Sequence, residues 1–299
     1  MKVIGIGHST FDTTLPVTEY PVENNKYRIT KHIECGGGSA ANATYLLAKW
    51  GLDTTMISAV GTDYYGDCIV KEFKSTGTDT TYLKQVPEHL TSSSYILANT
   101  SNGTRTIITS KDKPIERLDV PITSLKADLI MLDGEHPLTT LELLNNNPKA
   151  ISVFDVSHLT LENLAIGKKV TYLVCSHEFA ENFTDIKLDY NDMEILKECY
   201  EQLRVYFKTN IIITLESSGS FTKIDDEYKK IPSVKVKAVD STGAGDIFHG
   251  AFAYFIANGY KLEDAIHYAS IAGAISVTRV GARFSIPTLE EVLEYDDII

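Results

Sequence analysis

The stretch VDSTGAGDIFHGAFAYF, residues 239–255, places two aspartates around a turn of small residues and then continues in an apolar, helix-like pattern. Asp240 precedes the turn, and Asp246 falls in the first turn of the expected helix. Gly243 and Gly245 leave backbone N–H groups open at a helix N-terminus, where the helix dipole attracts anions. Because an aspartate is itself an anion, Asp246 either complements the helix dipole or acts as a base beside a site for a negative ligand.

The second interpretation gives this stretch a definite chemistry. A carboxylate here can take the proton of an attacking hydroxyl while neighbouring amides stabilise the charge on a transferring phosphoryl group. Asp246 is then the base, and Gly243, Ala244 and Gly245 form the anion hole. His249 lies three positions after Asp246 on roughly the same helix face, and we expect it to be a packed or surface histidine rather than a catalytic one.

The rest of the chain alternates short apolar runs with helical patterns. Strands are expected at residues 2–6, 56–60, 128–132, 151–154, 171–175 and 210–215. Helices are expected at residues 39–50, 64–75, 138–145, 177–183 and 191–207. Strands with continuous Val, Ile and Leu, separated by helices, indicate an α/β fold with a parallel sheet covered on both faces.

Two segments interrupt this alternation, residues 13–33 and residues 91–109. Both are polar, alternating and rich in β-branched residues, and the second contains a turn signal at Asn102-Gly103. We expect them to form a small β-structure that projects from the edge of the main sheet, within a single domain spanning residues 1–299.

Composition excludes several function classes. The formal net charge is −12 and no Lys/Arg cluster occurs, which disfavours nucleic-acid binding. The four cysteines are far apart and form no C-x-x-C pair, which disfavours a zinc cluster or a disulfide framework. No apolar run reaches the length of about 18 residues that a membrane span needs, so we expect a cytoplasmic protein without membrane contact.

A second glycine-rich turn, Gly36-Gly37-Gly38, precedes the helix expected at residues 39–50, with Ser39 expected as its N-cap. The turn is either a flexible connection or a place where a ligand approaches the backbone. The chain has no phosphate-binding G-x-x-x-x-G-K-[ST] loop. Gly5-x-Gly7 carries Thr10 where the dinucleotide fingerprint needs its third glycine, so an oxidoreductase is disfavoured.

Taken together, the motifs of this chain resemble those of the ribokinase/PfkB carbohydrate kinase family. The stretch from Asp240 to Asp246 is similar to the family's D-T-x-G-A-G-D motif. The tail at residues 272–282 is similar to its C-terminal helix and loop. Three further motifs agree in order and spacing, and the resemblance covers essentially the whole chain: Gly7-x-x-x-x-Asp12, Gly37-Gly38-x-x-x-Asn42 and Gly61-x-Asp63-x-x-Gly66.

This resemblance implies a doubly wound, mostly parallel α/β sheet with a small β lid, and an ATP-dependent sugar kinase that uses Mg²⁺. It implies that Asp246 is the catalytic base and that Gly243, Ala244 and Gly245 hold the γ-phosphate. Sugar hydroxyls would be bound by Asp12, Gly37, Gly38 and Asn42, and the nucleotide by Ser176, Thr214 and Ser270. A site for a monovalent cation such as K⁺ would be formed by Asp240, Thr242, Ser276, Arg279, Gly281 and Ser285.

The chain departs from the family pattern at two places. The family's Asn-x-x-Glu motif, which organises Mg²⁺ and phosphate, reads Ser176-His-Glu178-Phe here, and either Glu178 or Glu181 could replace it through water. Members similar to ketohexokinase also lack this motif. The family's Thr-Leu-Gly reads Thr214-Leu-Glu216, and we expect the Glu216 side chain to point outward.

The sequence leaves the substrate open. The triple glycine, the Pro21-x-x-x-x-Lys26-Tyr27 segment and the residues that follow Asp246 resemble the fructokinase and sulfofructose-kinase branch, which favours a fructose-like ketose, with ribose or a nucleoside next. A non-catalytic sugar- or nucleotide-binding protein is the alternative, although a pure binder needs no base. Exposed lid strands often pair at their edges, so a homodimer through the lid is a further expectation.

Overall fold

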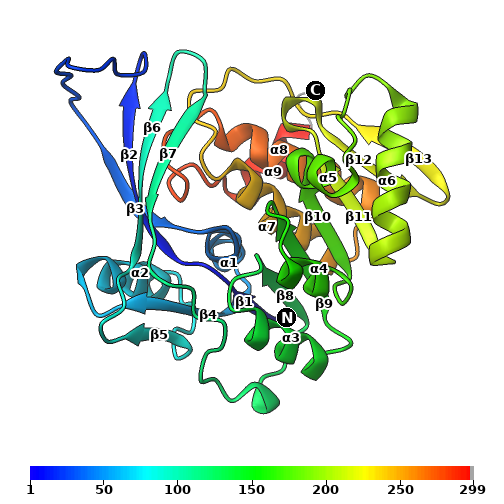
Figure 1. Cartoon of the computed structure of the whole chain (residues 1–299), viewed down its shortest axis with the longest axis horizontal. Coiled ribbons are helices and arrows are strands. Elements are labelled where there is room, and N and C mark those ends of the chain that lie inside the picture. The colour runs from blue at the N-terminus through cyan, green and yellow to red at the C-terminus, as the bar shows by residue number, and fades with distance from the viewer. Residues whose placement is uncertain (297–299) are drawn as a thin grey trace.

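A mostly parallel sheet forms the centre of the molecule in the computed structural model, which describes residues 1–296 (Figure 1). Its strands in this part of the chain are β1 (Lys2–Ile6), β4 (Asp53–Gly61), β5 (Leu83–Val86), β8 (Leu129–Leu132), β9 (Ile151–Val156), β10 (Tyr172–Ser176), β11 (Asn210–Thr214), β12 (Ser220–Ile224) and β13 (Glu227–Ile231). They lie in the order β13-β12-β11-β10-β9-β8-β1-β4-β5, and the only antiparallel pairs among the described strands of this sheet are β11–β12 and β12–β13. The doubly wound α/β fold predicted from the sequence is confirmed.

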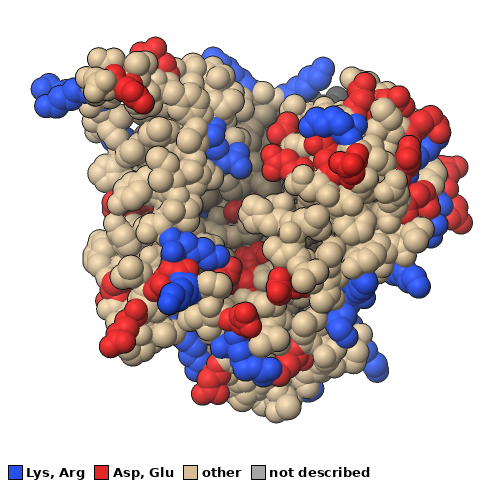
Figure 2. All heavy atoms as spheres, viewed as in Figure 1, with Lys and Arg blue, Asp and Glu red and all other residues tan. Residues whose placement is uncertain are grey.

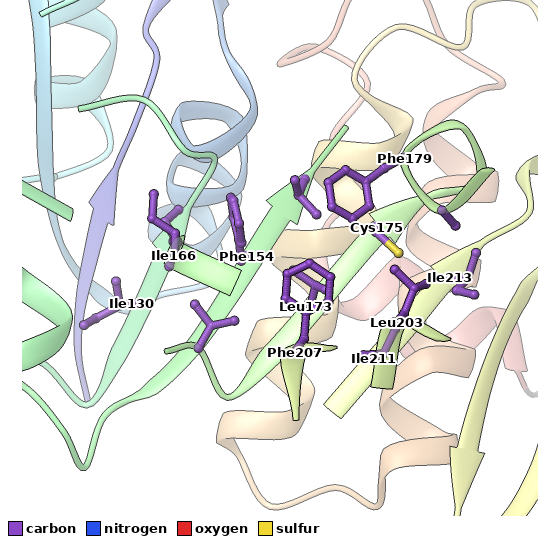
Figure 3. Packing of buried hydrophobic residues seen from close by; sticks show 14 of the residues in the cluster. Ile130, Phe154, Ile166, Leu173, Cys175, Phe179, Leu203, Phe207, Ile211 and Ile213 are labelled. Atoms are coloured by element: carbon purple, nitrogen blue, oxygen red, sulfur yellow. The ribbon is translucent and has the colours of Figure 1, made fainter. Parts of the chain in front are cut away.

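Helices cover both faces of this sheet because its strands are apolar on both sides, as in β8, where all four residues are buried. One face packs against α3 (Pro137–Asn146), α4 (Leu161–Gly167), α5 (His177–Thr184) and α6 (Met193–Phe207). Figure 3 shows this layer, in which Phe179 lies beside Cys175 and Phe207 lies beside Leu173. The other face packs against α1 (Ser39–Lys49), α7 (Ala244–Ala257), α8 (Leu262–Ser276) and α9 (Leu289–Asp296).

A second, four-stranded sheet stands beside the first one (Figure 1). Its strands, in the order β3-β2-β6-β7, are β2 (Thr10–Val17), β3 (Ile33–Gly37), β6 (Ser92–Asn99) and β7 (Arg105–Ser110), and α2 (Tyr64–Ser75) packs at its base. We call this sheet the lid. β2 begins before and β3 ends after the predicted segment 13–33, whereas β6 and β7 together span residues 92–110, close to the predicted segment 91–109. Residues 18–32 form no strand, because Pro21 and the turn at Glu23-Asn24 interrupt the pairing.

The strand order reverses between β1 and β8. From β1 the chain continues to β4 and β5 on one side, and from β8 to β9, β10 and β11 on the other. In such sheets ligands bind outside the carboxyl ends of the strands at this reversal point. The loops after β1 and β8 meet there, since the Asp133 carboxylate accepts the backbone N–H of His8 at 3.0 Å. Figure 2 shows a hollow between the lid and the main sheet, with acidic side chains at its floor.

The structure differs from the sequence prediction at several elements. It adds α4, β5, the β12–β13 hairpin and two short 3₁₀ turns, Ile122–Ser124 and Glu216–Ser218. The predicted N-cap of α1 was wrong, because Gly38 occupies that position with φ 98° and no side chain caps the helix. Within residues 1–296, no helix is long and apolar enough to cross a membrane.

Candidate active site

Asp246 lies in the first turn of α7 and is held by a side chain from α1. The Nδ2 group of Asn42 donates to Asp246 Oδ2 at 2.7 Å. Gly243, at the N-cap of α7, has φ 75°, and a Cβ there would come within 2.8 Å of the Ala282 Cβ. No side chain caps this helix, although the Ala244 N–H donates to the Ser241 carbonyl oxygen at 3.4 Å. The N–H groups of Gly245 and Asp246, in the same first turn, are therefore the donors that an anion could use.

Asp12 lies on β2, on the lid side of the same hollow. It is buried, and its Oδ1 atom has no hydrogen-bond partner. Burial raises the pKa of this carboxyl to about 6, and the negative charge of Asp246 acts in the same direction. A buried carboxylate oxygen without a donor is costly, which indicates that a ligand supplies one. Gly37 is required beside it, because a Cβ there would lie 2.0 Å from Asp12 Oδ2.

A buried ion pair fixes the orientation of the Asn42 amide. Arg283 donates from Nε to Asn42 Oδ1 at 3.1 Å and from Nη1 to Glu72 Oε2 at 2.8 Å. Its guanidinium also lies over the rings of Tyr45 and Phe73, at 4.7 and 4.6 Å from their centroids. Because Asn42 Oδ1 faces Arg283, its Nδ2 must face Asp246. A series of side-chain contacts, Glu72–Arg283–Asn42–Asp246, therefore connects α2 to the proposed base.

The Asp133 carboxylate, directly after β8, joins several backbone segments at the floor of the hollow by accepting their N–H groups. Besides His8 N–H, its carboxylate accepts the N–H of Ala40 and of Glu135, both at 3.1 Å. Burial raises its pKa to about 7, against the effect of these three amide donors. Position 7 requires glycine, because a Cβ there would lie 2.4 Å from the Asp133 carboxylate.

Of the three residues predicted to bind the nucleotide, two lie side by side and the third lies in a helix. Ser176 and Thr214 are register partners at the carboxyl ends of β10 and β11, and Ser176 Oγ caps α5 by accepting Phe179 N–H. Ser270 lies inside α8, buried, and its hydroxyl bonds to the Ile266 carbonyl of its own helix at 2.9 Å.

Two glutamates bear on the departures from the family motifs. Glu181, one of the two candidates to replace the Asn-x-x-Glu motif, pairs instead with Lys187 at 2.7 Å. Glu216 is exposed and has φ 53°, a left-handed backbone conformation that suits the glycine of the family motif better.

The predicted cation residues come from two loops that the fold joins. Asp240 is buried, and its carboxylate accepts three donors: Thr242 N–H at 2.9 Å, the Thr242 hydroxyl at 2.6 Å and Gly281 N–H at 2.8 Å. Arg279 turns its side chain to Glu291, so only its backbone is free for a cation. Ser276 and Ser285 are buried, and their hydroxyls bond to the carbonyls of Gly273 and Ala282. In residues 1–296, no group of three or more His, Cys, Asp or Glu could hold a metal ion.

Sequence reasoning missed four charged residues at this site: Glu72, Asp133, Asp155 and Arg283. Arg283 follows Gly281 in the tail motif by two positions, which was the only signal for it. Nothing in the linear pattern of the others distinguishes them from surface charges. His249, expected to be a packed or surface histidine, is buried and its Nε2 atom lies 3.3 Å from Asp155 Oδ1.

An α/β sheet with a lid, and a carboxylate in the first turn of a helix without a side-chain cap, match the arrangement expected of a phosphoryl-transfer enzyme. The family is then specific: the model of the pfkB family carbohydrate kinases matches residues 2–289, so this chain belongs to that family of sugar kinases. The chain is 29% identical to a ribokinase of Staphylococcus aureus (strain COL), which covers 97% of this chain and 98% of that protein. It is 28% identical to a deoxyribokinase of Salmonella typhi, covering 99% and 98%. A solved structure of Arabidopsis thaliana ribokinase, complexed with ribose and ATP, shares the fold with a TM-score of 0.81 at 20% identity, covering 98% of this chain and 97% of that one.

Proposed function

We propose that this protein transfers the γ-phosphoryl group of ATP to a hydroxyl of a small sugar. The observation that carries the proposal is the position of Asp246, which is oriented by Asn42 at 2.7 Å and stands beside the uncapped N-terminus of α7. A base and a set of oxyanion donors within one helical turn are what phosphoryl transfer to an alcohol requires.

The proposed reaction balances through these residues. Asp246 takes the proton of the sugar hydroxyl as its oxygen attacks the γ-phosphorus. The bond between that phosphorus and the bridging oxygen of ADP breaks, and ADP leaves with the electron pair. The N–H groups of the Gly243-Ala244-Gly245 turn stabilise the charge on the transferring group.

The sugar would lie between the lid and α1, with Asp12, Gly37, Gly38 and Asn42 around it. The unpartnered Asp12 Oδ1 supports this placement, because it can accept a sugar hydroxyl. Gly38 keeps the backbone close, since a Cβ there would come within 2.1 Å of the His8 carbonyl oxygen. The lid would exclude water that otherwise competes as the acceptor.

The nucleotide would lie at the carboxyl ends of β10 and β11, near Ser176 and Thr214, with Ser270 as a third contact from α8. Mg²⁺ keeps several waters and is commonly held by substrate phosphates, so we propose that it arrives with ATP. K⁺ would bind where the Asp240–Thr242 turn meets the segment from Ser276 to Ser285, and would stiffen the anion hole. Assays with K⁺ replaced by Na⁺ or a large organic cation test this, and equal turnover in all three would argue against it.

The substrate itself needs a screen. The named relatives act on ribose and deoxyribose by their names, which supports a pentose, whereas the branch resemblance of the sequence favours a fructose-like ketose. ATP consumption over a panel of pentoses, 2-deoxypentoses, ketoses and nucleosides, with product mass as a second readout, separates these classes. Nucleoside phosphorylation alone would replace the sugar by a nucleoside as the acceptor.

The role of Asp246 is tested by Asp246→Asn, with Asp128→Asn as the matched control. Asp128 stands just before β8, at the amino-terminal ends of the strands and away from the proposed site at their carboxyl ends, and it accepts the Lys2 N–H at 2.7 Å. We expect Asp246→Asn to lose at least a hundredfold in kcat while keeping sugar affinity, by analogy with the cost of about 10²–10⁴ for removing a general base. Unchanged turnover would remove Asp246 from the mechanism, and binding without turnover in the wild-type protein would support the non-catalytic alternative.

We further propose a homodimer through the lid. β7 is an edge strand of the lid sheet and all six of its residues are exposed, so its backbone groups are available for pairing. Light scattering of the wild-type chain, compared with an Ile107→Pro variant, tests the pairing, because Ile107 lies opposite Ile96 at a non-hydrogen-bonded position and its N–H faces the free edge of β7. A wild-type monomer at micromolar concentration would contradict it.

A further inference from the structure

His249 lies one helical turn after Asp246, buried under the anion-hole turn, and its ring faces only acceptors. Its Nδ1 atom is 2.6 Å from the Gly245 carbonyl oxygen. Its Nε2 atom is 3.3 Å from the Val174 carbonyl oxygen and 3.3 Å from Asp155 Oδ1. A neutral imidazole carries one N–H and can satisfy one side of this arrangement. The doubly protonated ring satisfies both.

Asp155, near the carboxyl end of β9, is the matching anion. Its side chain is 17% exposed, and burial raises the pKa of its carboxyl to about 6, with the negative charge of Asp246 acting in the same direction and His249 opposing it. A buried carboxylate that is ionised at neutral pH needs a cation and hydrogen-bond donors. His249 supplies the cation, and the Ser39 hydroxyl at the start of α1 supplies a further donor.

The contact with Gly245 connects this pair to the chemistry. The carbonyl that His249 holds belongs to the same peptide unit as the N–H of Asp246. Because the peptide unit is planar, holding the carbonyl also fixes the direction of that N–H. This N–H is one of the first-turn donors that have no side-chain cap. His249 therefore orients an anion-hole donor from behind.

We propose that His249 and Asp155 form a buried ion pair that positions the Gly245–Asp246 peptide and sets the electrostatic environment of the proposed base. The proposal rests on the sugar-kinase function proposed above. Both residues are positioning residues, because they act through the peptide and the charge of Asp246 and not through contact with the substrate.

The charges around the base decide the sign of the expected effects. The negative charge of Asp246 acts with burial to raise the pKa of Asp12 and of Asp155, so these three carboxylates form one electrostatic cluster. The cluster is faced by groups from several elements, and burial keeps the pKa of one of them, the Cys175 thiol, far above its usual range. These facing groups are Asn42 and Ser39 from α1, His249 from α7, His158 after β9, Cys175 from β10, and Arg283.

Two substitutions should shift the pH dependence of kcat/KM in opposite directions. The feature that shifts is the acid limb, the pH range in which kcat/KM falls as the pH is lowered. Asp155→Asn removes a negative charge, so the remaining carboxylates lose their protons more easily and the limb moves to lower pH. His249→Gln removes a positive charge, so the limb moves to higher pH. Each shift should be about one pH unit, the size typical of a charge at close range. The double variant keeps the net charge, so its limb should return close to that of the wild type.

A purely structural role predicts a different result. Both single variants would then lose turnover with an unmoved limb, or with shifts in the same direction, and either result overturns the proposal. Asp128→Asn is the charge control and should leave the limb in place. We expect kcat to fall about tenfold in His249→Gln with little change in the KM for sugar, because an anion-hole donor loses its support and is not removed.

A second measurement does not depend on activity. In wild-type protein labelled with ¹⁵N at histidine, the ring nitrogens of His249, assigned by their loss in His249→Gln, should show the imidazolium signature at neutral pH. In Asp155→Asn they should show the neutral ring. A neutral His249 in the wild type would overturn the ion pair even if the enzyme is active. If no sugar is phosphorylated but the imidazolium is found, the kinase proposal fails and the ion pair stands.

Discussion

Replacing Arg283 by methionine should weaken both the fold and the catalytic site. Methionine keeps most of the side-chain volume and removes the guanidinium. Arg283 is 3% exposed, and the substitution breaks its bonds to Glu72 at 2.8 Å and to Asn42 at 3.1 Å together with two ring contacts. The Asn42 amide is then free to rotate, so Asp246 loses its oriented donor.

The magnitude follows from what the substitution leaves behind. Breaking a buried ion pair costs about 3–5 kcal/mol, because the remaining charge is left without its partner. The Glu72 side chain is 28% exposed and still accepts the Gly36 N–H at 3.0 Å, so water can reach its charge. We therefore expect the lower end of that range, about 3 kcal/mol in the free energy of unfolding. Turnover should fall about tenfold, as expected when a catalytic group is misplaced but present.

Urea unfolding followed by the fluorescence of Trp50, the chain's only tryptophan, measures the stability term. Arg204→Met is the matched control, because Arg204 pairs with Glu201 at 2.7 Å on the surface of α6 with both side chains well exposed. Such pairs contribute about 0–1 kcal/mol. If Arg283→Met lowers the free energy of unfolding no more than Arg204→Met does and keeps full turnover, the series of contacts from Glu72 to Asp246 has no energetic role.

Three further predictions follow from single positions. Gly37→Ala should raise the KM for sugar at least tenfold while the protein still folds, because the new Cβ would lie 2.0 Å from Asp12 Oδ2 and must displace that carboxylate. Steady-state kinetics measure the KM and a thermal melt checks the fold. An unchanged KM would contradict the placement of Asp12. Sugar affinity should fall as the pH drops through about 6, because burial raises the pKa of Asp12 to about 6 and its protonated form no longer offers the anionic acceptor; calorimetric titration across this range should show it, and a flat profile would speak against Asp12 as the ligand. Glu216→Gly should stabilise the fold by about 0.5–1 kcal/mol, since a left-handed residue other than glycine costs about 1–2 kcal/mol and glycine returns part of this as unfolded-state entropy; a lower urea midpoint would refute the strain argument.

Local pattern predicted much of the fold. Strand β1 and helix α2 match their predicted bounds, because an apolar run and an amphipathic run each record one dominant requirement, burial of a strand or of one helix face. The β12–β13 hairpin was missed, because it lies at the sheet edge, where its strands, SFTKI and EYKKI, mix Ser, Thr, Lys and Glu with apolar residues and form no continuous apolar run. Ser39 was misplaced as a cap, because the sequence favours serine there, whereas the left-handed turn next to the His8 carbonyl admits only glycine.

The sequence by itself determined the alternation of strands and helices, the two glycine turns and the aspartate at the start of α7. These depend on neighbours along the chain, such as the N–H groups that a glycine turn leaves open. Only the tertiary structure decided which side chains surround that aspartate. Asn42, Arg283 and Glu72 meet because α1, α2 and the loop after α8 converge there, across separations of up to 241 positions. Charge and burial act through space, so no local sequence pattern identifies the residues that orient Asp246.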